Sequence, residues 1–156
     1  MLNALPDKDW IARHIPHQGR MCLLDRVEAW DAQHITCVSS THRASDHPLR
    51  AFGRLGAACG IEYAAQAMAV HGALLASPSS PTARAGYLVS VRETRLRVAR
   101  LDDLADDLIV EAESMARDAH TVHYWFAVSA GGRLLLDGRA MVVLDADALE
   151  SSGKHS

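Results

Sequence analysis

One long apolar segment limits the folds that this chain can adopt. Residues 55–76 form the one strong helix candidate, and the stretch Ala57–Ala76 contains eight alanines. Small side chains let neighbouring elements approach a helix closely on several sides. Glu62, Gln66 and His71 interrupt the apolar run, so it is not typical of a membrane span. We therefore expect a helix that is surrounded by the rest of its domain.

The remaining patterns predict strands, and the N-terminal part is expected to be poor in helix. A strand pair at 22–30 and 34–41 precedes the long helix. Four more strands are expected after it, at about 86–98, 107–116, 120–130 and 133–144. The turn formers of segment 77–84 predict a loop. Gly131-Gly132, between the last two strands, predicts a two-residue hairpin turn.

The strand at 86–98 changes its pattern half-way. The apolar residues around Val91 have odd residue numbers, and those around Leu96 have even ones. A strand of period two cannot bury both sets on one face without an extra residue. We expect a bulge or sharp bend near Glu93-Thr94, which would let the sheet curve around the helix.

One long helix and about six antiparallel strands predict an α+β arrangement, with the helix cradled by a curved sheet. A chain of 156 residues has the size of one ordinary domain. We place this domain at residues 1–150 and expect the polar tail, 151–156, to be disordered.

Charge and composition exclude several kinds of partner. The net charge is -3 and aromatic residues make up 5% of the chain, so nothing indicates a nucleic-acid surface. The N-terminus has no basic region followed by an apolar run. We therefore expect no signal peptide, no membrane association and a cytoplasmic protein. Three cysteines without metal-ligand spacing are interpreted as reduced structural thiols: Cys22, Cys37 and Cys59.

Two histidine pairs with i, i+3 spacing are candidate metal ligands: His14 with His17, and His120 with His123. Neither pair comes with the carboxylates or cysteines that would complete a site. The second pair lies in a strand pattern, where such residues point to opposite faces. The sequence also lacks a phosphate-binding loop, a dinucleotide fingerprint and a serine elbow. We expect neither a metal nor a cofactor.

Glu62 is the one carboxylate in the helix candidate. A carboxylate in apolar surroundings must be paired, protonated or next to a cavity. Gln66 lies one turn further on and shares its face, whereas His71 lies on the opposite side of the helix. Glu62 is therefore a candidate acid–base group. The alternative is a charge at the helix edge.

Two features just before the helix could complete a site. Pro48 favours an extended backbone at His47, which places this histidine on the approach to the helix. The alternative is a turn histidine with a satisfied hydrogen bond. The run Phe52–Ala58 offers no side-chain cap, so N–H groups near Gly56 and Ala57 could bind a carbonyl oxygen, an anion or water.

A basic stretch coincides with the end of the strand at 86–98. Its arginines are Arg92, Arg95, Arg97 and Arg100, and four aspartates follow between residues 102 and 107. The ordinary explanation is a solvated strand edge. The functional explanation is a docking site for an acidic carrier protein and its phosphopantetheine phosphate.

Two motifs resemble those of bacterial 3-hydroxyacyl-acyl-carrier-protein dehydratases. Residues 15–27, Ile-Pro-His-Gln-Gly-Arg-Met-Cys-Leu-Leu-Asp-Arg-Val, resemble the opening motif of that family. The helix Gly-Ile-Glu-Tyr-Ala-Ala-Gln-Ala-Met-Ala, from Gly60, matches the family's Glu-x-x-x-Gln helix through Glu62 and Gln66. The resemblance covers about residues 13–144. It is strongest to the predicted dehydratases found with aryl polyene pigment genes.

The resemblance implies a hot-dog fold, in which a curved antiparallel sheet wraps one long central helix. It also implies a dimer, homomeric or heteromeric, whose active site takes a histidine from one chain and a helix carboxylate from the other. The matching catalytic residues are His47 and Glu62. Substrate-binding roles are expected for Gln66, Gly56, Ala57 and His17. The chain departs from the family where His47-Pro-Leu-Arg replaces the usual His-Phe-Pro-Gly. The histidine-to-glutamate spacing is one residue longer than usual, so His17 is the second candidate.

The implied reaction is dehydration of 3-hydroxyacyl thioesters on acyl carrier protein to trans-2-enoyl thioesters, in fatty-acid-like or aryl polyene biosynthesis. His47 is expected to remove the C2 proton. Glu62, kept protonated by apolar surroundings, is expected to protonate the leaving hydroxyl. The N–H groups near Gly56-Ala57 would bind the thioester oxygen. Two alternatives stay open: an acyl thioesterase, and a non-catalytic hot-dog subunit that supports a catalytic homologue.

Overall fold

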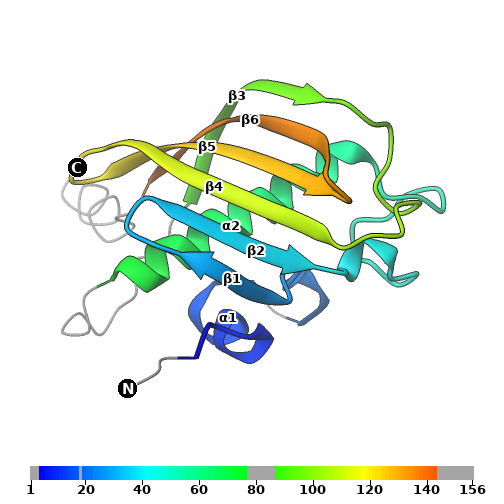
Figure 1. Ribbon diagram of the computed structural model, residues 1–156, viewed down its shortest axis with the longest axis horizontal. Coiled ribbons are helices and arrows are strands. Elements are labelled where there is room, and N and C mark those ends of the chain that lie inside the picture. Colours follow the sequence, from blue (N-terminus) through cyan, green and yellow to red (C-terminus); the bar gives the residue numbers. More distant parts are fainter. Residues whose placement is uncertain (1–3, 18, 77–86, 144–156) are drawn as a thin grey trace, which may run out of the picture.

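An N-terminal helix, a central helix and six strands make up most of the molecule (Figure 1). The computed structural model describes residues 4–17, 19–76 and 87–143. The elements are α1 (Lys8–His14), β1 (Arg26–Trp30), β2 (His34–Ser39), α2 (Gly60–Leu75), β3 (Tyr87–Leu96), β4 (Leu108–Arg117), β5 (Thr121–Ala130) and β6 (Arg133–Val143). Short 3-10 turns lie at Gly19–Met21, Thr41–Arg43 and Ala57–Cys59. The predicted strands and long helix are confirmed with shifted ends. The predicted loop at 77–84 and the tail at 151–156 lie outside the described residues.

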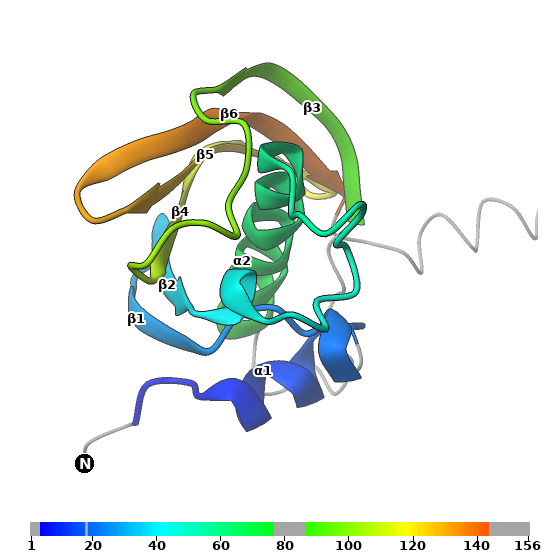
Figure 2. The same cartoon turned by 90° about the vertical axis from the view of Figure 1, so that its right-hand side faces the viewer.

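The six strands form one antiparallel sheet in the order β1-β2-β4-β5-β6-β3. Figure 2 shows this sheet curving around α2, with α1 below the central helix. The predicted hot-dog fold is therefore confirmed. Strands β1 and β3 lie at the two edges of the sheet. No helix of the described residues is long and apolar enough to cross a membrane.

The central helix is buried because small residues let the sheet come close to it. Ala64 and Ala67 are 0% exposed, and they alternate with the larger buried side chains of Tyr63, Met68 and Val70. The helix contacts β2, β4 and β5. Each small residue admits a neighbouring strand, so one helix can fill the concave side of the sheet.

The expected bulge in β3 is confirmed. Arg92 pairs with Arg139 and Arg95 pairs with Asp137, so the register shifts between these two pairs. Glu93, inside the shift, has a φ of 52°, a value that is uncommon for a residue with a side chain. The hairpin at Gly131-Gly132 is also confirmed, with φ values of 57° and 79° at the two glycines.

The expectation of a helix-poor N-terminus was wrong. Helix α1 begins after Asp7, whose carboxylate accepts a hydrogen bond from the Trp10 N–H at 2.9 Å. This N-cap compensates for the shortness of the helix. Ile11 is fully buried in the core, so α1 is held by tertiary packing as well as by its cap.

Gly138 generates a test of the packing at the β3 bulge. A Cβ at this position would lie 2.9 Å from the Phe126 ring and 2.9 Å from the Thr94 hydroxyl oxygen. We expect Gly138→Ala to lower the free energy of unfolding by roughly 1–3 kcal/mol, the usual range for overpacking. Urea denaturation measures this change. The control is Arg139→Ala on the exposed face of the same strand, which should change stability by about 0.5 kcal/mol or less. Equal effects of the two substitutions would contradict the packing account.

Candidate active site

Glu62 lies in the first turn of α2 and receives two hydrogen-bond donors. His17 Nε2 is 2.9 Å from Glu62 Oε1, and Gln66 Nε2 is 3.4 Å from the same oxygen. The side chains of His17 and Glu62 are 25% and 33% exposed, so the pair can be reached from outside the chain. The structure thus joins three of the predicted site residues into one cluster.

Gln66 attaches the segment before β1 to the central helix. Its amide oxygen accepts the Leu23 N–H at 2.8 Å, and its amide nitrogen donates to the Met21 carbonyl at 2.7 Å. The residue is 0% exposed. Gln66 therefore has no surface for a substrate in this chain, contrary to the expected substrate-binding role. It positions residues 21–23, which follow His17, against the helix that bears Glu62.

The charge state of Glu62 differs from the expected one. The hydrogen bond from His17 lowers the pKa of Glu62 below its ordinary value, and the bond from Gln66 acts in the same direction. Burial opposes this shift but does not reverse it. The apolar surroundings therefore do not keep Glu62 protonated as the sequence suggested, because paired donors outweigh desolvation.

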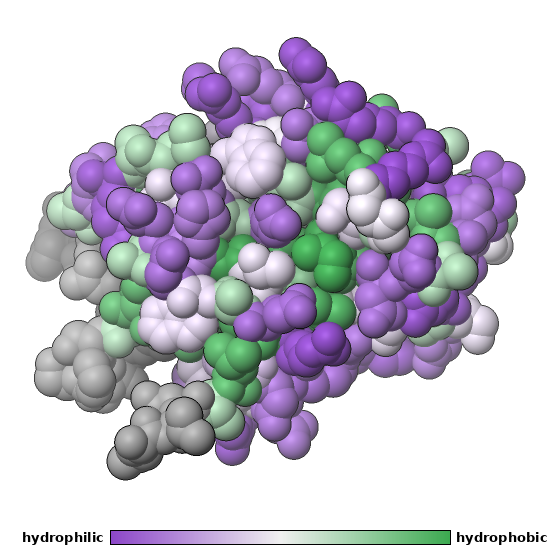
Figure 3. All heavy atoms as spheres, in the orientation of Figure 1, coloured by the Kyte–Doolittle hydropathy of each residue, from purple (hydrophilic) through white to green (hydrophobic). Residues whose placement is uncertain are grey.

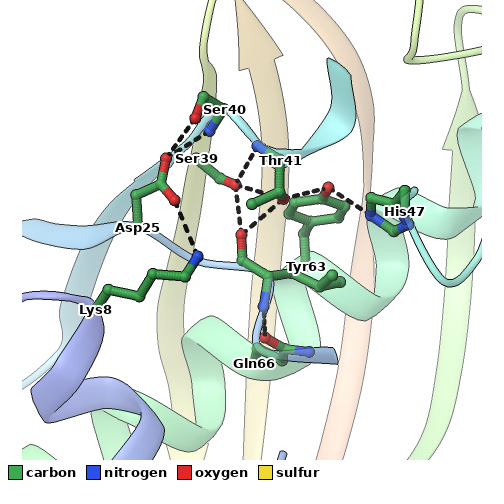
Figure 4. Close-up of polar contacts among 9 residues, drawn as sticks. Lys8, Asp25, Ser39, Ser40, Thr41, His47, Tyr63 and Gln66 are labelled. Atoms are coloured by element: carbon green, nitrogen blue, oxygen red, sulfur yellow. Dashed lines mark hydrogen bonds and ion pairs between the residues drawn. The ribbon is translucent and has the colours of Figure 1, made fainter. Parts of the chain in front are cut away.

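His47 lies in the segment before α2 and is 6% exposed. Its Nδ1 accepts the Leu49 N–H at 3.0 Å, and its Nε2 is 2.9 Å from the Tyr63 hydroxyl (Figure 4). Since Nδ1 is an acceptor, a neutral His47 carries its proton on Nε2 and donates it to Tyr63. Burial lowers the pKa of His47, which favours this neutral form.

The hydrogen bonds of His47 continue into a buried hydroxyl network. The Tyr63 hydroxyl is 2.7 Å from Thr41 Oγ1, which is 2.8 Å from the Leu23 carbonyl oxygen that it donates to. Ser39 donates to the same carbonyl (Figure 4). Burial raises the pKa of Tyr63 to about 12, so this phenol stays protonated. Sequence reasoning missed Tyr63 and Thr41. The signal available was a hydroxyl-bearing residue next to Glu62 in an otherwise apolar helix.

His47 and Glu62 are not hydrogen-bonded to each other within the described part of one chain. His47 contacts Tyr63, and Glu62 contacts His17. The second candidate histidine is thus the one that the fold brings to Glu62. His47 is nevertheless linked to the same helix, through the Tyr63 hydroxyl.

The start of α2 offers one of the two expected N–H groups. The Ala57 N–H donates to the Ala99 carbonyl at 3.1 Å, so it is already occupied and that expectation was wrong. Gly56 faces Arg100 in an antiparallel bridge whose hydrogen bonds flank it. In such a non-hydrogen-bonded pair the N–H points away from the partner strand. Open space surrounds the position of a Cβ at Gly56. The Gly56 backbone also forms a hydrogen bond with the Cys59 thiol, so a substrate oxygen would have to compete with that thiol for the Gly56 N–H.

A groove of about 220 Å³ opens beside His47. It is lined by Lys8, Gly19, Arg20, Cys22, Thr41, Ala44, Asp46, His47 and Pro48. A larger hollow of about 330 Å³ lies over β3 to β6, where Arg92, Met115 and Arg139 are among the lining residues. Figure 3 shows this outer face of the sheet, where apolar patches lie between hydrophilic side chains. The smaller groove contains a predicted site residue and the larger one contains none, so chemistry favours the smaller. The described residues contain no group of three or more potential metal ligands.

Comparison with known proteins identifies the family. A family model of ApeP-like proteins, described as ApeP dehydratase, matches residues 10–152. The chain belongs to the ApeP-like dehydratase family. No curated protein sequence matched the chain.

Solved structures agree on the fold of this ApeP-like chain. The dehydratase heterocomplex ApeI:P from Xenorhabdus doucetiae is similar, with 21% identity, a TM-score of 0.77, and coverage of 99% of this chain and 100% of that one. Zebra fish thioesterase superfamily member 2 is 13% identical, with a TM-score of 0.62 and coverage of 88% and 94%. A mutant thioesterase from Pseudomonas aeruginosa is 18% identical, with a TM-score of 0.55 and coverage of 76% and 80%. At these identities the structures establish the hot-dog fold.

The basic stretch of this ApeP-like chain is partly neutralised. Arg100 forms a tight ion pair with Asp102, and Arg97 lies 3.6 Å from Asp137. Arg92 and Arg95 are exposed on the outer edge strand, and no ion pair of the described residues includes them. Of the four arginines in this stretch, these two have no ion-pair partner among the described residues and are available to an acidic partner.

The His17–Glu62 pair predicts a measurable titration. In His17→Ala we expect the pKa of Glu62 to rise toward the ordinary value of 4.5, because the largest cause of its lowering is removed. Carbon-13 chemical shifts of the carboxyl group measure the titration directly. His14→Ala is the matched control, since His14 stacks on Trp10 and is exposed. An unchanged Glu62 titration in His17→Ala would refute the pairing.

Proposed function

We propose that the chain is a subunit of a dehydratase that converts 3-hydroxyacyl thioesters into trans-2-enoyl thioesters. The observation that carries this proposal is an accessible carboxylate on the central helix, held by donors from His17 and Gln66. Family membership supplies the reaction class. Elimination of water next to a thioester needs a group that takes the C2 proton and one that assists the departing hydroxyl.

The charge states favour Glu62 as the base. An ionised carboxylate can accept the C2 proton, whereupon the electron pair moves into an enolate stabilised at the thioester oxygen. Collapse of the enolate forms the C2–C3 double bond and breaks the C3–O bond. The hydroxyl takes the proton back from Glu62 and leaves as water, which restores the carboxylate. Atoms and protons balance without a cofactor.

His47 would act as a hydrogen-bond donor in this scheme. A neutral imidazole whose Nδ1 is occupied by Leu49 can offer only its Nε2–H, and a substrate oxygen would have to replace the Tyr63 hydroxyl that accepts this hydrogen bond. A glutamate base beside a neutral imidazole donor is an established combination for proton abstraction next to a carbonyl. These roles reverse those expected from the sequence. The Gly56 N–H would supply a second donor to the thioester oxygen.

The proposed site is shared between two hot-dog subunits, because within one chain His47 is engaged by Leu49 and Tyr63, and Glu62 by His17 and Gln66. Strand β3 is an edge strand, and an unpaired edge is available for pairing with a second sheet. The similar ApeI:P structure is a dehydratase heterocomplex. A homologous subunit is therefore one source of the second half-site, and a second copy of this chain is the other.

The second candidate function is that of a supporting subunit without catalysis of its own. The observation that favours it is the engagement of both His47 nitrogens, by Leu49 and Tyr63. A homologue would then supply the catalytic histidine. The same Glu62 could still contribute to that mixed site.

Glu62→Gln tests the catalytic role. The amide keeps the shape of the side chain but cannot accept a proton. Turnover of a 3-hydroxyacyl thioester should fall by roughly 10²–10⁴-fold, the usual range for acid–base catalysis. Mass spectrometry distinguishes the enoyl product from the free acid that a thioesterase would release. Melting temperature, measured on the same preparation, is the control for folding.

Three other outcomes contradict parts of this proposal. Unchanged turnover would exclude Glu62 from the site. Full turnover by a complex of a hot-dog homologue with the His47→Ala, Glu62→Gln double variant would identify a supporting subunit without catalysis of its own. The pH profile separates base from acid: with the pKa of Glu62 lowered, activity is lost only as the pH falls through that value, below 4.5. Activity that rises on acidification through the same range would require a protonated Glu62 instead.

Carrier docking is tested at the two arginines that remain available. Arg92→Glu with Arg95→Glu should weaken use of a carrier-linked substrate and flatten its salt dependence. Use of a small thioester without a carrier should survive, provided that analytical ultracentrifugation shows unchanged subunit assembly, since β3 is also the edge proposed to pair with a second subunit. Equal loss on both substrates would contradict docking at this strand.

A further inference from the structure

A strained turn displays one aromatic side chain to solvent just before α2. The Ala51 N–H donates to the Arg54 carbonyl at 2.9 Å, and the Arg54 N–H donates to the Ala51 carbonyl at 3.1 Å. This two-residue turn leaves Phe52 with a φ of 54° and Gly53 with a φ of 74°. Glycine and asparagine are favoured at both positions of such a turn, and a bulky residue is strained there. Phe52 is nevertheless fully exposed, at 102%.

The residues on either side of this turn are held by several hydrogen bonds. The Arg50 guanidinium donates to the Ala44 carbonyl at 2.7 Å and to the Gly53 carbonyl at 3.3 Å, and it lies 3.5 Å from Asp102. The Asp102 side chain is 5% exposed and accepts the Leu55 N–H at 2.9 Å. These bonds hold the turn rigidly, so the Phe52 ring is already positioned for a partner. Less conformational entropy is therefore lost when a partner buries the ring.

The turn lies next to the segment that follows the edge strand β3. Backbone bonds join the residues after the turn to those after β3: Ala57 to Ala99, and Leu101 to Leu55. Figure 1 shows the start of α2 and the end of β3 at the same end of the molecule. Leu96, the last residue of β3, is 49% exposed and adds a second apolar side chain at the edge strand.

We propose that Phe52 is an anchor that docks on a second copy of this chain, next to paired β3 edges. The proposal rests on the two-subunit assembly in the proposed function and specifies one of its contacts. An edge strand can pair with its own copy in antiparallel fashion around a two-fold axis. Such symmetry buries two Phe52 rings, one from each chain. A phenylalanine buries about 150–250 Å² and is typical of interface hot spots, whereas an exposed one in a strained turn gains nothing for the isolated chain.

Phe52→Gly gives effects of opposite sign on folding and on assembly. Glycine releases the strain, so the melting temperature of the dilute, monomeric chain should rise by about 2–4 °C. The dissociation constant for self-association should increase roughly tenfold or more, because the anchor is lost. Analytical ultracentrifugation of the full chain over a range of concentrations measures the second quantity. Phe52→Tyr keeps the ring and should associate as the wild type does.

Met115→Ser is the matched control, because Met115 is 56% exposed on β4, away from the β3 edge. It should leave self-association unchanged. Self-association of Phe52→Gly with the wild-type dissociation constant would overturn the anchor while the two-subunit assembly stands. A wild-type chain that stays monomeric, or that associates only with a homologous subunit, would overturn docking on a second copy. Dehydration by that monomer would in addition overturn the shared site.

Discussion

The buried amide of Gln66 is the interaction on which the site depends. It bonds to both the N–H of Leu23 and the carbonyl of Met21, and so fixes an irregular segment against the central helix. Removing one partner would leave a buried polar group unsatisfied, which costs about 1–3 kcal/mol. The same segment carries His17 to Glu62 on one side. On the other side it presents the Leu23 carbonyl to the hydroxyls of Ser39 and Thr41.

This arrangement assigns different tasks to the two candidate catalytic residues. Glu62 accepts hydrogen bonds from two donors and is partly exposed to solvent, so it is ionised and accessible. His47 has an acceptor role at one nitrogen and a donor role at the other, so it is neutral and fixed. Burial alone would favour a protonated glutamate, but at Glu62 the hydrogen bond from His17 outweighs burial. At His47 burial itself favours the neutral imidazole, and the Leu49 N–H occupies the Nδ1 atom that could otherwise act as a base.

The sequence determined the fold more completely than the site. Three local patterns were enough to predict the helix, the β3 bulge and the last hairpin. They are the alanine-rich helix, the change in the apolar pattern around Glu93, and the glycine pair at 131–132. The pairing of His17 with Glu62 depends on contacts between residues 45 positions apart, which no period or spacing reveals. The occupation of the Ala57 N–H by Ala99 is equally non-local. Helix α1 was missed although its Asp7 cap is a local signal, because a short helix depends on tertiary packing.

The claim that the site is shared between two chains is tested most directly by mixing two inactive variants. His47→Ala and Glu62→Gln would each be purified and then combined under conditions that allow subunits to exchange. A mixed dimer contains one site with both wild-type residues and one site with neither. The account predicts that dehydration returns on mixing, to about half the turnover of a wild-type dimer for each mixed dimer. Activity that stays absent, although mixed dimers are demonstrated by mass, would contradict a site built from His47 of one chain and Glu62 of the other.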